Sequence, residues 1–155
     1  MLLQQVIDDI INASISLQIE GHGMERIFIK TRKKNELVDI TSEVKKTIEH
    51  LQVNDGICLV YCPHTTGGIT VNEAFDPSVQ GDIIFSLNKI SPDYPEFRHS
   101  EGNSDAHVKC SLIGNSETFI IENGKIMLGQ WQGIYFTEFD GPRSREVWVK
   151  VIKNS

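Results

Sequence analysis

The sequence contains few cysteines, and their number is odd: Cys58, Cys62 and Cys110 are the only three in 155 residues. An odd count without framework spacing argues against a disulfide-stapled fold. Cys58 and Cys62 could form a metal-binding pair, but the ICLVYC run around them is typical of a strand. In a strand, an offset of four residues places both side chains on one face. We therefore expect buried, structural cysteines.

The sequence also lacks a long apolar run and an excess of positive charge. No stretch approaches the ~20 apolar residues that a membrane-spanning helix needs. The first residues place Asp8 and Asp9 inside their apolar part, which is not typical of a signal peptide. The net charge of −6 argues against a nucleic-acid or anionic-membrane partner. We expect a cytoplasmic protein in which any anion-binding site is local.

Short apolar or alternating runs between turn residues recur along the chain and predict strands. These runs are residues 26–31, 37–40, 57–62, 69–72, 117–121, 126–128, 134–139 and 146–152. Helix starts are indicated at Thr41 or Ser42, at Asp76-Pro77 and at Asp105. We expect an α+β fold, an antiparallel-strand-rich sandwich with two or three helices.

The length of the chain is that of one domain with a sizeable core. Residues 1–20 carry apolar residues at helical spacing, and Gly21-His22-Gly23 then breaks the pattern. We expect residues 1–25 to form an N-terminal extension, helical or partly ordered, and residues 26–155 to form a single domain. An oligomer contact is the functional alternative for the extension.

Three of the five histidines stand in polar segments rich in turn formers. His64 follows the predicted strand 57–62, whereas His99 and His107 flank the stretch Gly102–Asp105. We expect these segments to meet and the three imidazoles to hold one divalent metal, because a catalytic zinc has three protein ligands and an open position. The alternative is that they are loop histidines hydrogen-bonded to nearby carboxylates.

Several charged residues could complete such a site. Glu73 and Asp105 could orient the histidine rings through their N–H groups, and Glu73 could instead act as a general base. Arg143 and Arg145 alternate along one extended segment, and guanidinium groups suit phosphate or carboxylate. With Lys109 and the backbone of residues 65–68 they could form an anion pocket. The alternative for the arginines is a pair of surface salt bridges.

Four motifs, in this order along the chain, resemble the YjbQ-like family, whose members are often labelled secondary thiamine-phosphate synthases. The first is CPHTTGGITVNE at residues 62–73, followed by Asp76-Pro77. The second is His99 together with GNSDAH at residues 102–107. The others are LGQWQGIY at residues 128–135 and EFDGPR at residues 138–143. The resemblance extends from about residue 27 to the C-terminus.

The resemblance implies an α+β fold that assembles as a homotrimer. It also implies the joining of a hydroxymethylpyrimidine diphosphate to a thiazole phosphate with release of pyrophosphate, a reaction that needs a divalent ion on the diphosphate. The site residues that it implies are His64, His99 and His107, with Glu73, Asn103, Asp105, Gln132 and Arg143 nearby.

We therefore expect a metal-dependent enzyme acting on a small phosphorylated metabolite, with Zn, Mg or Mn as the ion. The expected catalytic residues are Glu73, Asp105 and Asn103, and the expected metal ligands are His64, His99 and His107. The expected anion-binding residues are Thr65, Thr66, Gly67, Lys109, Gln132, Arg143 and Arg145. A metal-dependent hydrolase of a phosphorylated or carboxylated substrate is one alternative, and a non-enzymatic trimeric module that binds a metabolite or protein is another.

Overall fold

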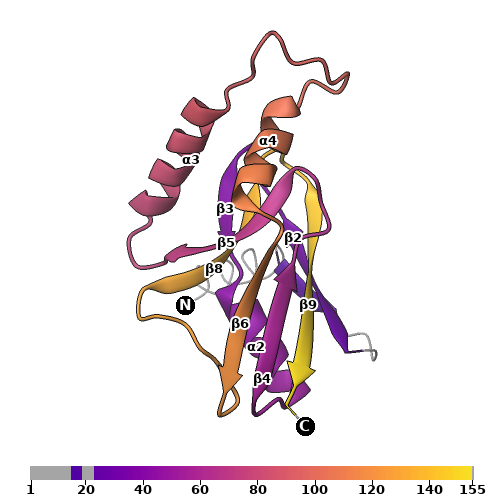
Figure 1. The fold of residues 1–155 in the computed structure, drawn as a ribbon, viewed down its shortest axis with the longest axis vertical. Helices are drawn as coiled ribbons and strands as arrows, with labels where there is room; N and C mark the ends of the chain where they lie inside the picture. The colour runs from indigo at the N-terminus through magenta and orange to yellow at the C-terminus, as the bar shows by residue number, and fades with distance from the viewer. Residues whose placement is uncertain (1–14, 19–22, 155) are drawn as a thin grey trace, which may run out of the picture.

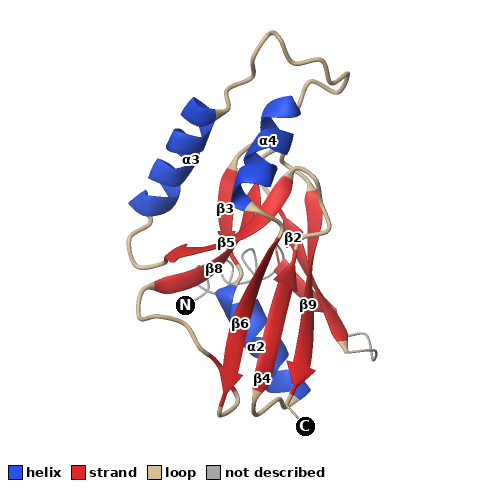
Figure 2. Ribbon diagram, viewed as in Figure 1, coloured by secondary structure: helices blue, strands red, loops and turns tan. Residues whose placement is uncertain are grey.

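The computed structural model describes residues 15–18 and 23–154, which fold into two antiparallel sheets and three helices (Figures 1 and 2). The larger sheet has the order β1(Ile15–Gln18), β2(Met24–Lys30), β9(Ser144–Lys153), β4(Gly56–Tyr61), β6(Ser116–Glu122), β7(Lys125–Ile126). The smaller sheet has the order β3(Glu36–Asp39), β8(Gln132–Glu138), β5(Gly67–Glu73). The helices are α2(Thr41–Leu51), α3(Ser78–Ile90) and α4(Ser104–Ile113). The predicted α+β sandwich is confirmed.

One element differs from the prediction at the start of the described chain. Residues 15–18 form strand β1, which pairs antiparallel with β2 from Ile15 opposite Ile29 to Gln18 opposite Arg26. The predicted helix is therefore wrong over these residues, because pairing with the sheet edge overrides the helical spacing. The rest of that prediction lies outside the described residues.

The core forms where period-2 apolar positions of the large sheet meet helix α2. Ile27 in β2 and Val149 in β9 are fully buried, and Val44 and Ile48 of α2 pack into the same cluster. Burial of each such side chain stabilises the fold by roughly 1.5–3 kcal/mol. Asn-Gly is a dipeptide typical of tight hairpins, and Asn123 and Gly124 both have positive φ and join β6 to β7.

Helix α3 lies to one side of the sheets (Figure 1). The sequence predicts a buried stripe of Val79, Ile83, Leu87 and Ile90, but of these only Leu87 is buried, and Ile90 is 60% exposed. Helical spacing shows which face of a helix is apolar. It does not show whether another element covers that face. No helix in the described ranges is long and apolar enough to cross a bilayer.

Helix α4 is fixed to strand β5 at its C-terminal end. The carbonyl oxygen of Gly114, just after the helix, accepts a hydrogen bond of 3.1 Å from the amide of Ile69. A Cβ atom at Gly68 would lie well inside the contact distance of the same carbonyl oxygen. Strand and helix therefore approach as closely as they do because residue 68 has no side chain.

This contact predicts the effect of Gly68→Ala. The added methyl group would overlap the backbone carbonyl oxygen of Gly114. We therefore expect the free energy of unfolding to fall by about 1–3 kcal/mol in chemical denaturation. Gly81→Ala is the matched control, because Gly81 lies in α3 with open space around its Cβ position. That change should stabilise the protein by about 0.5–1 kcal/mol. Equal effects of the two substitutions would contradict the account.

Candidate functional site

Two of the predicted site histidines come together at the start of helix α4. The rings of His99 and His107 lie edge to face, with centroids 5.2 Å apart. The turn before the helix makes this possible: Gly102 has a φ of 68° and donates from its amide to the carbonyl oxygen of His99 at 3.0 Å. The predicted polar loop thus folds back so that residues eight positions apart face each other.

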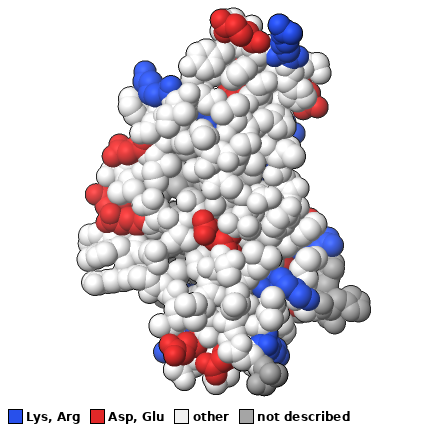
Figure 3. All heavy atoms as spheres, in the orientation of Figure 1, with Lys and Arg blue, Asp and Glu red and all other residues white. Residues whose placement is uncertain are grey.

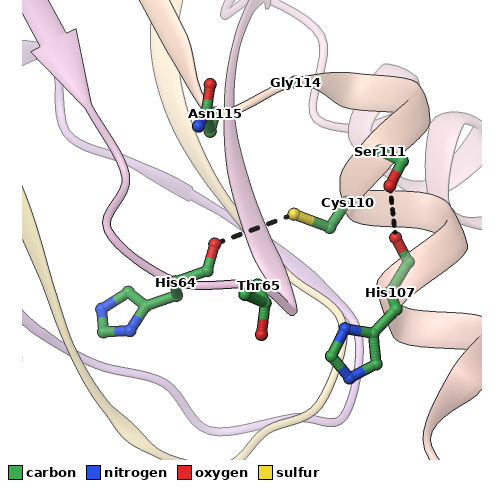
Figure 4. Close-up of a pocket in the computed structure, with 7 residues that line it drawn as sticks. All are labelled: His64, Thr65, His107, Cys110, Ser111, Gly114 and Asn115. Carbon is green, nitrogen blue, oxygen red and sulfur yellow. Dashed lines mark hydrogen bonds between the residues drawn. The ribbon is translucent and has the colours of Figure 1, made fainter.

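His64 does not join this pair. Its Nε2 atom lies 3.0 Å from the amide nitrogen and 3.1 Å from the carbonyl oxygen of Glu146, so the ring is held by the backbone of β9. Figure 4 shows the His64 ring pointing away from His107. The three histidines therefore do not converge within one chain, and the metal site stays a prediction. Among the described residues, no group of three or more His, Cys, Asp or Glu side chains could hold a metal ion.

A polar cavity of about 270 Å³ forms beside the histidine pair, and we call it the anion cavity. It brings together the loops before β5, before α4 and between β8 and β9. Its lining residues are Thr65, Thr66, His99, Glu101, Asn103, His107, Asp140, Arg143 and Arg145. Most of the predicted site residues thus lie around one cavity, although the three histidines do not converge on one point.

Arg145 is built into the floor of the anion cavity. Its guanidinium donates to both carboxylate oxygens of Glu138, from Nε at 2.8 Å and from Nη2 at 2.6 Å, and also to the Thr66 hydroxyl at 2.8 Å. Burial alone would lower the pKa of Arg145, but the bonds and charge of Glu138 outweigh it and raise the pKa. This is a buried, bidentate pair rather than the surface salt bridge of the alternative prediction.

Arg143 is the more accessible of the two arginines, with 52% of its side chain exposed. It donates from Nε to the Asp140 carbonyl oxygen at 2.7 Å and from Nη2 to the Asp140 carboxylate at 2.6 Å. The same carboxylate accepts from Asn103 Nδ2 at 2.9 Å, which links the β8–β9 loop to the start of α4. Asn103 Oδ1 is buried and has no hydrogen-bond partner in the described part of the chain.

Asp105 and Lys109 lie outside the anion cavity. Lys109 is 1% exposed and donates to Asp105 Oδ2 at 2.8 Å, one turn back along α4, and Lys34 approaches the same oxygen at 3.6 Å. Burial raises the pKa of Asp105, but the hydrogen bond and charge of Lys109 outweigh it and hold the pKa below its usual value. Lys109 thus binds Asp105 Oδ2, whereas Asp105 Oδ1 is buried without a hydrogen-bond partner among the described residues. A catalytic role of Asp105 and anion binding by Lys109 stay predictions.

Glu73 and Gln132 are also misplaced by the sequence prediction. They pair with each other across β5 and β8, whereas Gly67 and Glu138 pair at the end that borders the anion cavity. Six residues of strand separate the two ends, or roughly 20 Å. Within one chain, Glu73 and Gln132 therefore lie away from the histidine pair, and their site roles stay predictions. Gly67 itself is buried, and its carbonyl oxygen accepts from the Cys110 thiol at 2.9 Å.

The cysteines are structural, as predicted. All three are free and buried. Burial raises the pKa of Cys58 and that of Cys62 to about 12, and it also raises the pKa of Cys110. The thiolate is the reactive form of cysteine, so these groups are poor nucleophiles near neutral pH.

Sequence reasoning missed three acidic residues at the cavity. Glu101 and Asp140 line it, and Glu138 lies beneath it bound to Arg145. Glu138 and Asp140 both belong to the EFDGPR motif, so the motif was a usable signal for them. On the face shown in Figure 3, acidic and basic side chains lie in small separate groups.

The environment of His64 predicts a pH dependence of stability. Burial and the nearby charge of Arg145 lower the pKa of His64 below 6.5 in the folded state. The unfolded chain therefore binds this proton more readily, so stability is lost as pH falls below 6.5. We expect His64→Gln to reduce the loss of unfolding free energy between pH 7.5 and pH 5.5, measured by chemical denaturation.

The matched control for this prediction is His50→Gln, because His50 is an exposed histidine at the end of α2. It should leave the wild-type pH dependence in place. A His64→Gln variant as pH-dependent as the wild type would show that the ring is not held in its neutral form.

Comparison with known proteins places the chain in a family. The family model "UPF0047 protein YjbQ-like" matches residues 25–154. The UPF0047 protein MJ1081 of Methanocaldococcus jannaschii is 57% identical over 124 residues, covering 80% of this chain and 90% of the relative. The UPF0047 protein YugU of Bacillus subtilis is 46% identical over 130 residues, covering 83% and 98%.

Solved structures agree with this assignment. A crystal structure of a YjbQ/UPF0047 family protein from Clostridium acetobutylicum is 54% identical and matches with a TM-score of 0.80, covering 82% of this chain and 98% of that one. A YbjQ-like protein of Sulfolobus solfataricus matches with a TM-score of 0.81 at 28% identity, covering 90% and 99%. The chain is therefore a member of the YjbQ-like UPF0047 family.

Proposed function

We propose that the chain is an enzyme that acts on a small phosphorylated metabolite bound in the anion cavity. The observation that carries the proposal is the convergence of two imidazoles, His99 and His107, with the guanidinium of Arg143 around one polar cavity. The segment around the start of α4 supplies the imidazoles and the β8–β9 loop supplies the guanidinium. The buried pair of Glu138 and Arg145 connects β8 and β9 to the loop before β5 through Thr66.

Phosphate recognition rests on donors that remain available after the internal contacts are made. A guanidinium has five N–H donors, and the contacts of Arg143 with Asp140 occupy two of them. The hydroxyl of Thr65 and the two imidazoles supply further polar groups. Asp140 is itself bound by Arg143 and Asn103, so its negative charge is largely offset at the cavity wall.

Proton transfer is assigned to the histidine pair. Imidazole is the side chain whose ordinary pKa suits acid–base work near neutral pH. His99 Nε2 lies 4.0 Å from a carboxylate oxygen of Glu101. This set could serve either the transferase reaction implied by the family resemblance or a hydrolysis, since both handle a proton next to a phosphate.

Arg143→Ala tests the binding part of the proposal. Removing a charged hydrogen-bond donor costs about 1.5–3 kcal/mol, so we expect the affinity for inorganic phosphate to fall by roughly 10- to 100-fold in calorimetric titration. Arg32→Ala, at an exposed arginine outside the cavity, is the matched control and should bind phosphate as the wild type does. Equal loss in both variants would rule out the anion cavity as the site.

Turnover is tested on the same preparations with the hydroxymethylpyrimidine diphosphate and the thiazole phosphate, in the presence of Mg²⁺ or Mn²⁺. We expect wild-type protein to form thiamine phosphate and His107→Gln to form at least 100-fold less, as is typical for loss of an acid–base group. Phosphate binding without turnover on these or simpler phosphate esters would favour the non-enzymatic binding module.

A divalent ion remains part of the proposal, with a smaller ligand set than the sequence predicts. In that case His99 and His107 would hold the ion instead of transferring the proton, and the ion would supply charge stabilisation at the phosphate. We expect Co²⁺ titration, followed by visible absorption, to show binding that His107→Gln removes and His64→Gln preserves. Loss of binding in both variants would restore the three-histidine site. Assembly as a homotrimer also stays a prediction.

A further inference from the structure

A serine hydroxyl lies beside the histidine pair. A cavity of about 290 Å³ is lined by His99, Ser104 and His107, and we call it the serine cavity. It adjoins the anion cavity, because both histidines line the two spaces. Its surface is mainly apolar, and the polar groups of its lining side chains are the serine hydroxyl and the ring nitrogens. A candidate nucleophile therefore stands next to two candidate bases.

Helix α4 sets the spacing between the serine and one of the imidazoles. Ser104 is the first residue of the helix, and His107 lies three positions later. Side chains three residues apart lie on the same face of a helix, with their Cβ atoms roughly 5–6 Å apart. The His107 ring projects outward from α4 (Figure 4). Rotation of the two side chains can therefore bring an imidazole nitrogen to the serine oxygen when a substrate binds.

The Ser104 hydroxyl is not used by the fold. It makes no hydrogen bond to another residue in the part of the chain that the structure describes. The helix is preceded by Asn103 at the N-cap position, so Ser104 is not the capping residue. A serine that neither caps its helix nor bonds to a neighbour has its oxygen available for chemistry.

Hydrogen-bond donors for the charge of a reacting phosphate lie close to the same hydroxyl. Within the described ranges the amides of Ser104 and Asp105 make no hydrogen bond, because the side chain of Asn103 does not cap the helix. Amides at the start of a helix stabilise negative charge. Arg143 adds a guanidinium from the adjoining anion cavity. A phosphate held by Arg143 thus lies between charge-stabilising groups and the serine.

We propose that Ser104 is the nucleophile of the reaction, so that turnover of a phosphate ester passes through a phosphoserine. The inference rests on the proposed function, with the histidine pair free to transfer protons. His107 takes the hydroxyl proton while the bond from Ser104 Oγ to phosphorus forms. The bond from phosphorus to the leaving oxygen breaks with its electron pair, and that oxygen receives a proton from the imidazolium of His99.

Water completes the cycle by the reverse exchange. Its oxygen attacks phosphorus while His99 takes its proton. The bond between phosphorus and Ser104 Oγ breaks, and the oxygen recovers its proton from His107. The serine and both imidazoles return to their starting forms, and the products are the free alcohol and inorganic phosphate.

The stereochemistry at phosphorus tests this step on the unmodified protein. Each in-line displacement inverts phosphorus, so two successive displacements give net retention, whereas direct attack by water gives net inversion. The substrate is p-nitrophenyl phosphorothioate made chiral with oxygen isotopes, and it is hydrolysed in isotopically labelled water. We expect net retention in the thiophosphate product, read by phosphorus NMR. Net inversion would overturn the inference while leaving the proposed function in place.

Ser104→Ala tests which residue carries the phosphoryl group. We expect turnover of p-nitrophenyl phosphate to fall by at least ~100-fold, as for loss of a nucleophile, while inorganic phosphate still binds in calorimetric titration. Acid-quenched wild-type protein should carry one HPO₃ group on the peptide that contains Ser104, detected by mass spectrometry.

Ser78→Ala is the matched control, because Ser78 is also the first residue of a helix, α3, and lines neither cavity. It should turn over the ester and carry the HPO₃ group as the wild type does. Wild-type turnover in Ser104→Ala, or an HPO₃ group on a different residue, would show that Ser104 is not the nucleophile. If the wild type binds phosphate but turns over no phosphate ester, the proposed function fails together with the inference.

Discussion

The candidate site depends on one buried ion pair between Glu138 and Arg145. The carboxylate accepts two guanidinium hydrogen bonds, one from the Thr31 hydroxyl, and two from the backbone amides of Phe139 and Asp140. Removing one partner of such a pair leaves an uncompensated buried charge, which typically costs about 3–5 kcal/mol. The pair therefore adds little to net stability. Its main effect is to fix the positions of the residues bonded to it.

The ion pair influences the position of every segment that lines the anion cavity. Arg145 holds Thr66, and so the segment before β5, through the hydroxyl bond of 2.8 Å. The β8–β9 loop is further held at Arg143, whose amide donates to the Thr31 hydroxyl at 2.7 Å. With the loop in this position, Asp140 meets Asn103 at the start of α4, and the histidine pair faces the same space. A site built from loops thus has its geometry set by strands β2, β8 and β9.

Local pattern was enough to predict most of the fold. The strands, the buried face of α2 and the Asn123-Gly124 hairpin all follow from periodicity or turn chemistry within a few residues. The exposed face of α3 could not be predicted this way, because burial of a helix face depends on a partner that is distant in sequence. The same limit explains β1, whose pairing with β2 overrides its own helical spacing.

The sequence predicted which residues belong to the candidate site better than it predicted how they are arranged in space. His99 and His107 meet because one short turn joins them, and a local pattern can show that. His64 lies only two residues from Thr66, yet its ring bonds to Glu146 in another strand. Glu73 is close to His64 in the motif, but the course of β5 carries it away from the cavity. Glu138 belongs to the EFDGPR motif and Arg145 was a predicted anion-binding residue, but only the packed fold shows that the two are buried and paired.

The central claim is that phosphate binds between His99, His107 and Arg143, with His64 held apart by the backbone. Its most direct test is a phosphate titration of protein with ¹⁵N-labelled histidine, followed by NMR of the imidazole nitrogens. The account predicts that the resonances of His99 and His107 move with one common dissociation constant while those of His64 and His50 stay in place. Movement of His64 together with the other two, or no movement at any of them, would contradict it.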